Sequence, residues 1–183
     1  MKDTLRTAND PMGAAIYDFH KKGKAGKLIV HSSSFEDDEI PVDTLFREFK
    51  EMPALEQKAL KRASGRILDV GAGSGCHSLA LKAMGKNCLA IDISPLSVNV
   101  MKERGVNARL VNLYDDSFNE KFDTILMLMN GSGIIGKVEN LPAFFRRMDS
   151  LLAEGGQVLM DSSDLIYLYE EEDGSVSIDL AGA

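Results

Sequence analysis

Three alternating glycines, set between a short apolar run and a helical segment, constrain this chain more than any other feature. Residues 67–70 read Ile-Leu-Asp-Val and predict a buried strand, after which the glycines follow at Gly71, Gly73 and Gly75. From residue 78 onward the apolar residues recur at helical spacing. This order is typical of a nucleotide-binding crossover, in which glycines allow a sharp turn and the first helical N–H groups point at a ligand.

The glycine spacing and a neighbouring acid indicate the kind of ligand. A dinucleotide fingerprint reads G-x-G-x-x-G, but position 76 is a cysteine and the third glycine comes one residue earlier. Asp69, two residues before the first glycine, would repel a pyrophosphate and suits a cation. S-adenosylmethionine (SAM) has no phosphate and carries an ammonium and a sulfonium. The charges therefore favour SAM over NAD or FAD, with another Rossmann-like crossover as the alternative.

The segment Leu68–Gly75 closely resembles the first motif of class I SAM-dependent methyltransferases. The resemblance implies an α/β fold with a Rossmann-like, doubly wound parallel sheet. It also implies that the cofactor lies against Asp69, Gly71, Ala72, Gly73, Gly75 and His77. For His77, which follows the glycine loop, a contact at the start of the helix is a more ordinary role than that of a general base.

Two further strands are expected to supply the ribose and adenine contacts. Residues 87–92 predict a strand that ends in Asp92, about 20 residues past the glycines, where an acid can accept hydrogen bonds from both ribose hydroxyls. A helix-start acid favoured by the helix dipole is the alternative for Asp92. The run from residue 91 to 95 resembles the second motif of the family and adds Ile93 to the expected site.

The third strand is predicted at residues 108–111 and is followed by Asn112 and Leu113. In the family an acid often stands at the position of Asn112 and contacts the adenine amino group. An amide oxygen can accept the same hydrogen bond, so the resemblance implies that Asn112 and Leu113 frame the adenine. Asp115 and Asp116 are alternatives, and a plain turn is an equally good reading of those two.

The fourth strand is predicted at residues 122–129, a continuous apolar run typical of a strand buried on both faces. It opens into the loop 130–136, and in open α/β sheets the ligand lies outside the carboxyl ends of the strands. Met129 and Asn130 should therefore border the reacting methyl group. The loop resembles the N-G-x-G-I-x-G loop of some small class I methyltransferases, in which Asn130 either positions a nucleophile or caps the turn.

The family resemblance ends with a helix and a fifth strand, and covers residues 64–162 in all. A helix is expected at 141–152, with Arg146 and Arg147 solvated, and a strand at 157–161. Beyond it, residues 165–180 read as one hairpin around an Asp-Gly turn. The usual fold has seven strands, so the C-terminal strands are expected to be missing, and a fragment of a longer enzyme is favoured over a hairpin that replaces them. The open edge could also support a homodimer.

Two domains are expected, an N-terminal helical cap at 1–62 and a SAM-binding domain at 63–183. The cap should contain a helix at 11–19, a strand or lid at 27–32, an acidic loop at 33–41 and helices from residue 42 to 62.

Composition restricts the partners and the compartment. The chain has 183 residues and a formal charge of −7, which argues against a nucleic-acid binder. It contains no apolar run of about 18 residues that would predict a membrane span. The N-terminus does not resemble a signal peptide. The two cysteines, Cys76 and Cys88, do not have a metal-binding spacing, so a reduced, cytoplasmic protein without a metal site is expected.

The predicted function is methyl transfer from SAM to a small-molecule acceptor. A general base is needed only if the acceptor arrives protonated. The candidates for that base are Tyr17, His20 and His31, for which the sequence favours structural roles. Asn130 is a further catalytic candidate, which would position a nucleophile rather than take a proton. A non-catalytic SAM-binding module is the alternative function, and a nicotinamide oxidoreductase is disfavoured by Asp69 and Cys76.

Overall fold

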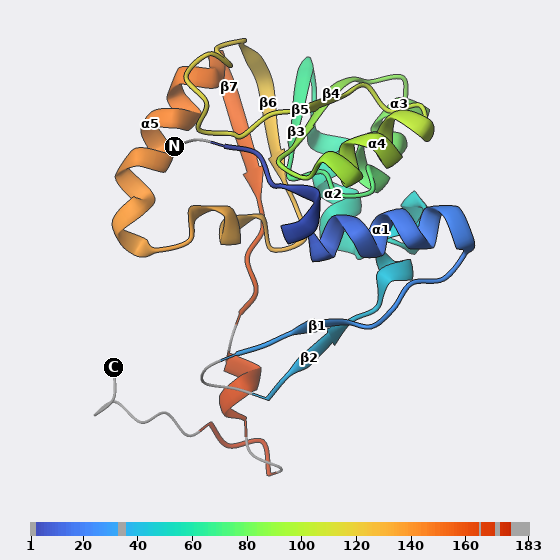
Figure 1. The fold of residues 1–183 in the computed structure, drawn as a ribbon. Helices are drawn as coiled ribbons and strands as arrows, with labels where there is room; N and C mark the ends of the chain where they lie inside the picture. The colour runs from blue at the N-terminus through green and yellow to red at the C-terminus, as the bar shows by residue number, and fades with distance from the viewer. Residues whose placement is uncertain (1–2, 33–35, 165, 171–172, 177–183) are drawn as a thin grey trace.

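The protein is described here from a computed structural model. The structure describes all residues except 1–2, 33–35, 165, 171–172 and 177–183. Figure 1 shows the chain with its elements labelled.

A five-stranded, fully parallel sheet forms the centre of the molecule, with strand order β5-β4-β3-β6-β7 (Figure 1). The predicted Rossmann-like α/β class is therefore confirmed. The chain order reverses between β3 and β6, and ligands bind at such switch points, outside the carboxyl ends of the strands. The strands are β3 (Arg66–Val70), β4 (Asn87–Asp92), β5 (Ala108–Leu110), β6 (Phe122–Met127) and β7 (Leu152–Met160).

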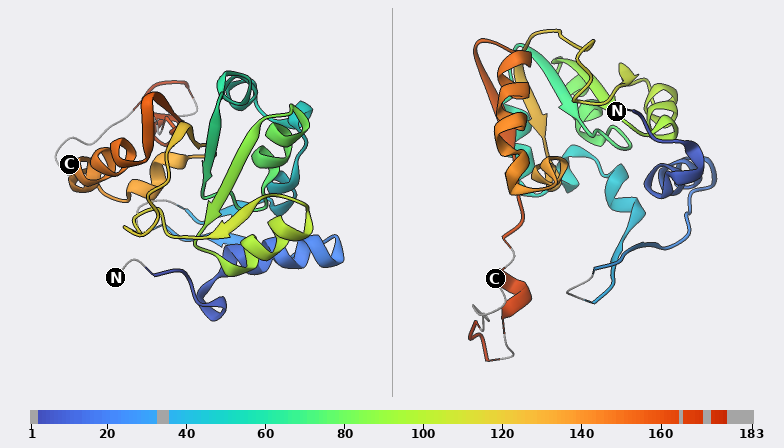
Figure 2. Two further views of the ribbon diagram at one scale, coloured as in Figure 1. Left: turned by 90° about the horizontal axis from the view of Figure 1, so that it is seen from above. Right: turned by 60° about the vertical axis from the view of Figure 1, so that its left-hand side comes forward.

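Helices cover both faces of this sheet (Figure 2). On one face, Leu68 and neighbouring strand residues pack against Phe144, Met148 and Leu151 of the last helix. On the other face, Ile67 packs against the helices before and after β3. Successive strand residues point to opposite faces, so adjacent residues such as Ile67 and Leu68 enter different cores. The helices are α1 (Pro11–Lys22), α2 (Ala54–Arg62), α3 (Cys76–Ala83), α4 (Pro95–Glu103) and α5 (Leu141–Leu151).

The N-terminal part lies against α4 and extends into a two-stranded hairpin that projects from the body (Figure 1). The hairpin pairs β1 (Leu28–Val30) with β2 (Asp38–Ile40) in antiparallel register. The prediction that 33–41 is a loop is therefore wrong for β2, where the Lys27–Glu39 ion pair joins the two arms of the hairpin. Residues 33–35 lie outside the described part.

The helix expected from residue 42 is instead two short 3-10 helices, η2 (Val42–Phe46) and η3 (Phe49–Glu51). Arg47 and Glu48 between them have extended backbone angles, which end the helical path. The break turns Arg47 towards α2, where it pairs with Glu56. The apolar spacing is helical, but the extended backbone at Arg47 and Glu48 interrupts the helix and accompanies this tertiary ion pair.

The hairpin predicted at 165–180 is also wrong in its first half. Residues Ile166–Tyr169 form a 3-10 helix, η6, because the Asp164 carboxylate accepts the Ile166 N–H and starts a helical turn. A single antiparallel bridge joins Glu170 to Val176. Residues 165, 171–172 and 177–183 lie outside the described part.

Among the described residues, no helix is both long and apolar enough to span a bilayer.

Candidate functional site

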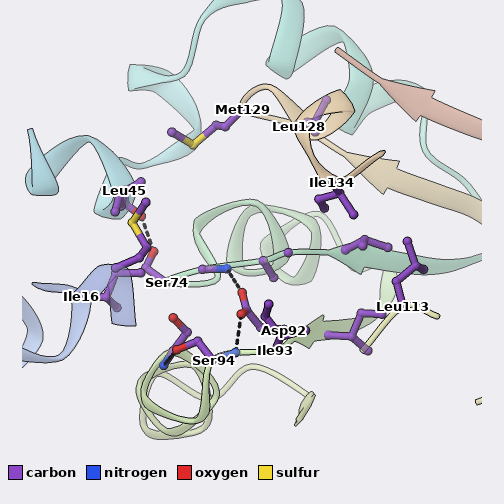
Figure 3. A pocket seen from close by; sticks show the side chains of 18 of the residues that line it. Ile16, Leu45, Ser74, Asp92, Ile93, Ser94, Leu113, Leu128, Met129 and Ile134 are labelled. Atoms are coloured by element: carbon purple, nitrogen blue, oxygen red, sulfur yellow. Dashed lines mark hydrogen bonds between the residues drawn. The ribbon is translucent and has the colours of Figure 1, made fainter. Parts of the chain in front are cut away.

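A cavity of about 650 Å³ lies at the carboxyl ends of the central strands (Figure 3). Its wall comes from the glycine loop after β3, the ends of β4 and β5, the turn after β6, and the N-terminal segment. The remaining 3-10 helices are η1 (Thr7–Asn9) and, after β6, η4 (Gly131–Ile135) and η5 (Val138–Asn140). The cavity therefore lies where open α/β sheets bind their ligands, outside the carboxyl ends of the strands.

The glycine loop forms the floor of the cavity and requires glycine for its backbone. Gly71, Gly73 and Gly75 have φ angles of 67°, 56° and 82°, in the left-handed region where a side chain is strained. At Gly75 an added Cβ would also lie 2.9 Å from Met101 Cγ. The loop leads directly into α3, whose first turn carries His77 against the cavity.

Asp92 is the carboxylate in the middle of the cavity wall (Figure 3). Its two oxygens accept the Gly73 N–H at 2.9 Å and the Ser94 N–H at 2.8 Å. Burial raises the pKa of Asp92, while the two backbone N–H donors oppose that effect. A carboxylate oxygen can accept more than one hydrogen bond, so Asp92 retains acceptor capacity towards the cavity.

The segment after β5 supplies another side of the wall, with Asn112, Leu113 and Tyr114. The Asn112 side-chain oxygen accepts the Tyr114 N–H at 3.0 Å, and its amide nitrogen donates to the Asp3 carbonyl at 3.1 Å. Asn112 therefore also fastens the turn of its own loop.

The turn after β6 is strained where it meets the cavity. Met129 and Asn130 both line the cavity and have φ angles of 60° and 62°, which non-glycine residues seldom adopt. Asp161, just beyond β7, holds the turn from both sides. Its carboxylate accepts the Met129 N–H at 2.9 Å and the Gly131 N–H at 3.0 Å. Such strain persists only where surrounding contacts impose it, and it clusters at functional sites.

A buried ion network ties the cavity wall to the N-terminal part. His77 Nε2 lies 2.8 Å from Glu56 Oε2, and Arg47 donates to both oxygens of Glu56 at 2.5 Å. Burial acts to raise the pKa of Glu56, but the hydrogen bonds from His77 and Arg47 outweigh it and hold that pKa below its usual value. Sequence inspection missed Glu56 and Arg47, because neither lies near a recognisable motif.

The N-terminal segment crosses the cavity and is fastened to the end of β4. The Leu5 N–H donates to the Ile93 carbonyl at 2.8 Å. The Ser94 hydroxyl donates to the buried Asp10 carboxylate at 2.5 Å, and Asp10 also accepts the Gly13 N–H as the N-cap of α1. Asp10 and Leu5 were not predicted, and only the Asp-Pro pair that starts α1 could have signalled Asp10.

The structure brings ten of the twelve expected cofactor-binding residues together in this cavity wall. They are Gly71, Ala72, Gly73, His77, Asp92, Ile93, Asn112, Leu113, Met129 and Asn130. The other two, Asp69 and Gly75, do not line the cavity. Asp69 points to the α3 face of the sheet, where its buried carboxylate accepts the Ser78 hydroxyl at 2.6 Å. Burial raises the pKa of Asp69.

Of the four candidate catalytic residues, only Asn130 lines the cavity. His20 pairs with Glu103 on α4, and His31 pairs with Asp37 on the hairpin. Tyr17 lies under the ammonium group of Lys21, 5.5 Å from the ring centroid.

The charges of the wall discriminate between ligand classes. The described residues that line the cavity include no Lys or Arg, and their carboxylates are Asp10 and Asp92. A pyrophosphate would therefore meet two carboxylates and no lysine or arginine here, whereas a cationic ligand would be attracted by both carboxylates. An adenosine with a sulfonium fits this lining better than a dinucleotide.

Comparison with known proteins supports this interpretation. Residues 44–172, well over half of the chain, match a family model described as a methyltransferase domain. A crystal structure of a SAM-dependent methyltransferase from Bacteroides fragilis, in complex with S-adenosylhomocysteine, is 63% identical with a TM-score of 0.89. The match covers 95% of this chain and 73% of that one.

Two more distant relatives are less similar. The cypemycin N-terminal methyltransferase of a Streptomyces species is 29% identical over 102 residues, which cover 54% of this chain and 42% of that protein. The chain thus spans less than half the length of this curated relative. The sugar N-methyltransferase KedS8 from a Streptoalloteichus species has a TM-score of 0.56 at 20% identity, covering 75% of this chain and 60% of that one, which shows a shared fold.

The family match agrees with the glycine loop, the acid at the end of β4 and the carboxylates of the cavity wall. The chain belongs to the SAM-dependent methyltransferases.

Proposed function

We propose that this chain binds SAM in the cavity described above and transfers its methyl group to a small-molecule acceptor. The observation that carries the proposal is the cavity itself, which joins the glycine loop, Asp92 and the turn at Asn130 in one space with no lysine or arginine among its described lining residues. The relative crystallised with S-adenosylhomocysteine supports the same cofactor.

In this proposal the glycine loop and His77 hold the methionine end of the cofactor. Asp92 accepts hydrogen bonds from the ribose hydroxyls, and Ile93, Asn112 and Leu113 frame the adenine. Asp69 and Gly75 act indirectly, because Asp69 is bonded to Ser78 behind the loop and Gly75 provides the turn into α3.

The cofactor supplies a methyl group on a sulfonium, and its thioether leaves with the electron pair of the broken carbon–sulfur bond. The acceptor's lone pair forms the new bond to carbon, and any proton the acceptor carried must then be lost. The wall contributes orientation and exclusion of water. Met129, Ile134 and Leu128 give it an apolar side near the Asn130 turn (Figure 3).

The proposal is tested by calorimetric titration with SAM, S-adenosylhomocysteine and, as a control, NADH. Saturable binding of the first two without NADH binding is expected, and it justifies an acceptor screen that measures S-adenosylhomocysteine formation. A folded protein that binds none of the three would refute the proposed cofactor. SAM binding without turnover on any acceptor would instead favour the non-catalytic module.

Three further assignments belong to this proposal. Residues 1–62 are the cap and 63–183 the cofactor-binding domain. A cytoplasmic location is supported by Cys76 and Cys88, which are free thiols rather than disulfide-bonded. A homodimer is supported by the edge position of β7 in the sheet, and light scattering of the purified chain tests it.

A further inference from the structure

The loop between β5 and β6 carries one side of the cavity wall but contains no regular strand or helix in its cavity-lining part. Asn112, Leu113 and Tyr114 line the cavity from this loop. After Val111, whose N–H donates to the Asp92 carbonyl, the backbone bonds of the loop are short-range, from the Asp115 N–H to the Asn112 carbonyl and from the Phe118 N–H to the Asp115 carbonyl. Such a loop needs outside contacts to keep a single conformation.

Besides the core packing of Leu113 and Phe118 and the bond from Asn112 to Asp3, one side chain supplies three such contacts. In Figure 1 the yellow loop runs beside α5, and Arg147 of α5 donates to three of its carbonyls. These are Leu113 at 2.5 Å, Asp115 at 2.8 Å and Phe118 at 2.5 Å. The expectation that Arg147 is solvated is therefore wrong. Its guanidinium offers several donors in one plane, so it can bond three converging carbonyls at once.

The helix that carries Arg147 is itself packed into the core. Arg147 lies beside Phe144 and Met148 in the α5 sequence, and both are buried in the core that also holds Leu113 and Phe118. Helix α5 is thus held against the sheet. The three hydrogen bonds from Arg147 then hold the loop backbone in place relative to this helix. The neighbouring Arg146 is exposed and provides a matched comparison on the same helix.

We propose that Arg147 is a positioning residue that holds the loop 111–118 in the conformation that receives the adenosine part of the cofactor. This inference rests on the proposed function, because it assumes that the cavity takes SAM. Arg147 does not line the cavity, so it acts only through the carbonyls that it bonds. Without it the loop samples other conformations, and cofactor affinity falls by the fraction of time spent in them.

The experiment compares Arg147→Met, which keeps the length of the side chain without its donors, with Arg147→Lys and the control Arg146→Met. SAM and 5′-methylthioadenosine, which lacks the amino-acid part, are titrated against each folded protein. If the competent loop population falls to about a tenth, Arg147→Met raises both dissociation constants about tenfold and by the same factor. Arg147→Lys keeps some of the donors and should lose less, and Arg146→Met should bind as the unmodified protein does.

Hydrogen exchange of the Tyr114, Asp115 and Phe118 amides gives a readout that does not need a ligand. Faster exchange confined to this loop in Arg147→Met supports this positioning role, whereas unchanged exchange with unchanged affinity overturns it. Weaker SAM binding with unchanged 5′-methylthioadenosine binding also overturns it, because the adenosine side would then be intact. If Arg147→Met does not fold, the Arg147→Lys comparison decides. If the unmodified protein binds no SAM, the proposed function fails, and with it the cofactor role of the loop.

Discussion

The strained turn at Met129 and Asn130 gives a prediction that can be worked through in energies. Asp161→Ala removes two hydrogen bonds from backbone N–H groups to a charged acceptor. Both bonds lie near solvent, so the low end of the usual range applies, about 1.5 kcal/mol each or about 3 kcal/mol together. Freed from Asp161, the two left-handed residues can relax, which returns about 1 kcal/mol each. The expected net loss of unfolding free energy is therefore only about 1 kcal/mol.

A second background separates the strain from the hydrogen bonds. In Asn130→Gly the left-handed backbone at position 130 costs little, so Asp161→Ala has less strain to release there. The same substitution should then destabilise by about 2 kcal/mol, about 1 kcal/mol more than in the unmodified chain. The two substitutions are therefore expected to be coupled, and together they should destabilise the chain by about 1 kcal/mol more than the sum of their separate effects.

Urea denaturation at neutral pH, followed by circular dichroism, measures these differences if the m-values stay equal. Asp164→Ala is the matched control, because the Asp164 carboxylate accepts a single N–H in a segment away from the cavity, and it should change stability by less than about 0.5 kcal/mol. An equal cost of Asp161→Ala in both backgrounds would refute the reasoning that Asp161 holds strain in this turn.

Three other predictions concern the cavity and its supports. Glu56→Gln leaves Arg47 and His77 without their buried carboxylate and should destabilise by about 3 kcal/mol in urea denaturation at pH 7. Because the pKa of Glu56 is lowered in the folded state, its contribution is present above the unfolded pKa of about 4.3 and is lost as pH falls below that value through the lowered folded pKa. The stability of the variant should therefore fall less steeply with acid. Asp92→Ala removes a charged acceptor for two ribose hydroxyls and should weaken SAM binding about 100-fold by calorimetry, whereas unchanged affinity would exclude the ribose contact. Gly75→Ala places a Cβ at a φ of 82° and 2.9 Å from a methionine side chain of α4, so its melting temperature should be lower than that of the unmodified chain. An equal melting temperature would contradict the packing argument.

The parts of the fold that the sequence predicted are those encoded by neighbouring residues. The glycine loop, the acid that ends β4 and the five strands in their order all follow from patterns a few residues long. The position of the cavity follows from that order, since parallel strands present their carboxyl ends at one edge. This is why most expected site residues meet in one wall.

The parts that the sequence did not predict depend on pairs of residues that are distant in the chain. Glu56 meets His77 from another helix, and Arg147 meets a loop about 30 residues earlier. A single sequence offers no signal for such pairs. The same applies to residues 42–52, where the apolar spacing is helical but the chain forms two 3-10 helices and Arg47 pairs with Glu56.

The N-terminal segment across the cavity has a consequence for the speed of turnover. Leu5 and Asp10 are fastened to the end of β4 and also line the cavity, so a cofactor in the cavity would contact this N-terminal segment. We expect exchange of spent for fresh cofactor to be coupled to detachment of this N-terminal segment, a motion on the microsecond-to-millisecond scale or slower. We expect the residence time of S-adenosylhomocysteine to shorten in Asp10→Ala even where its affinity changes little.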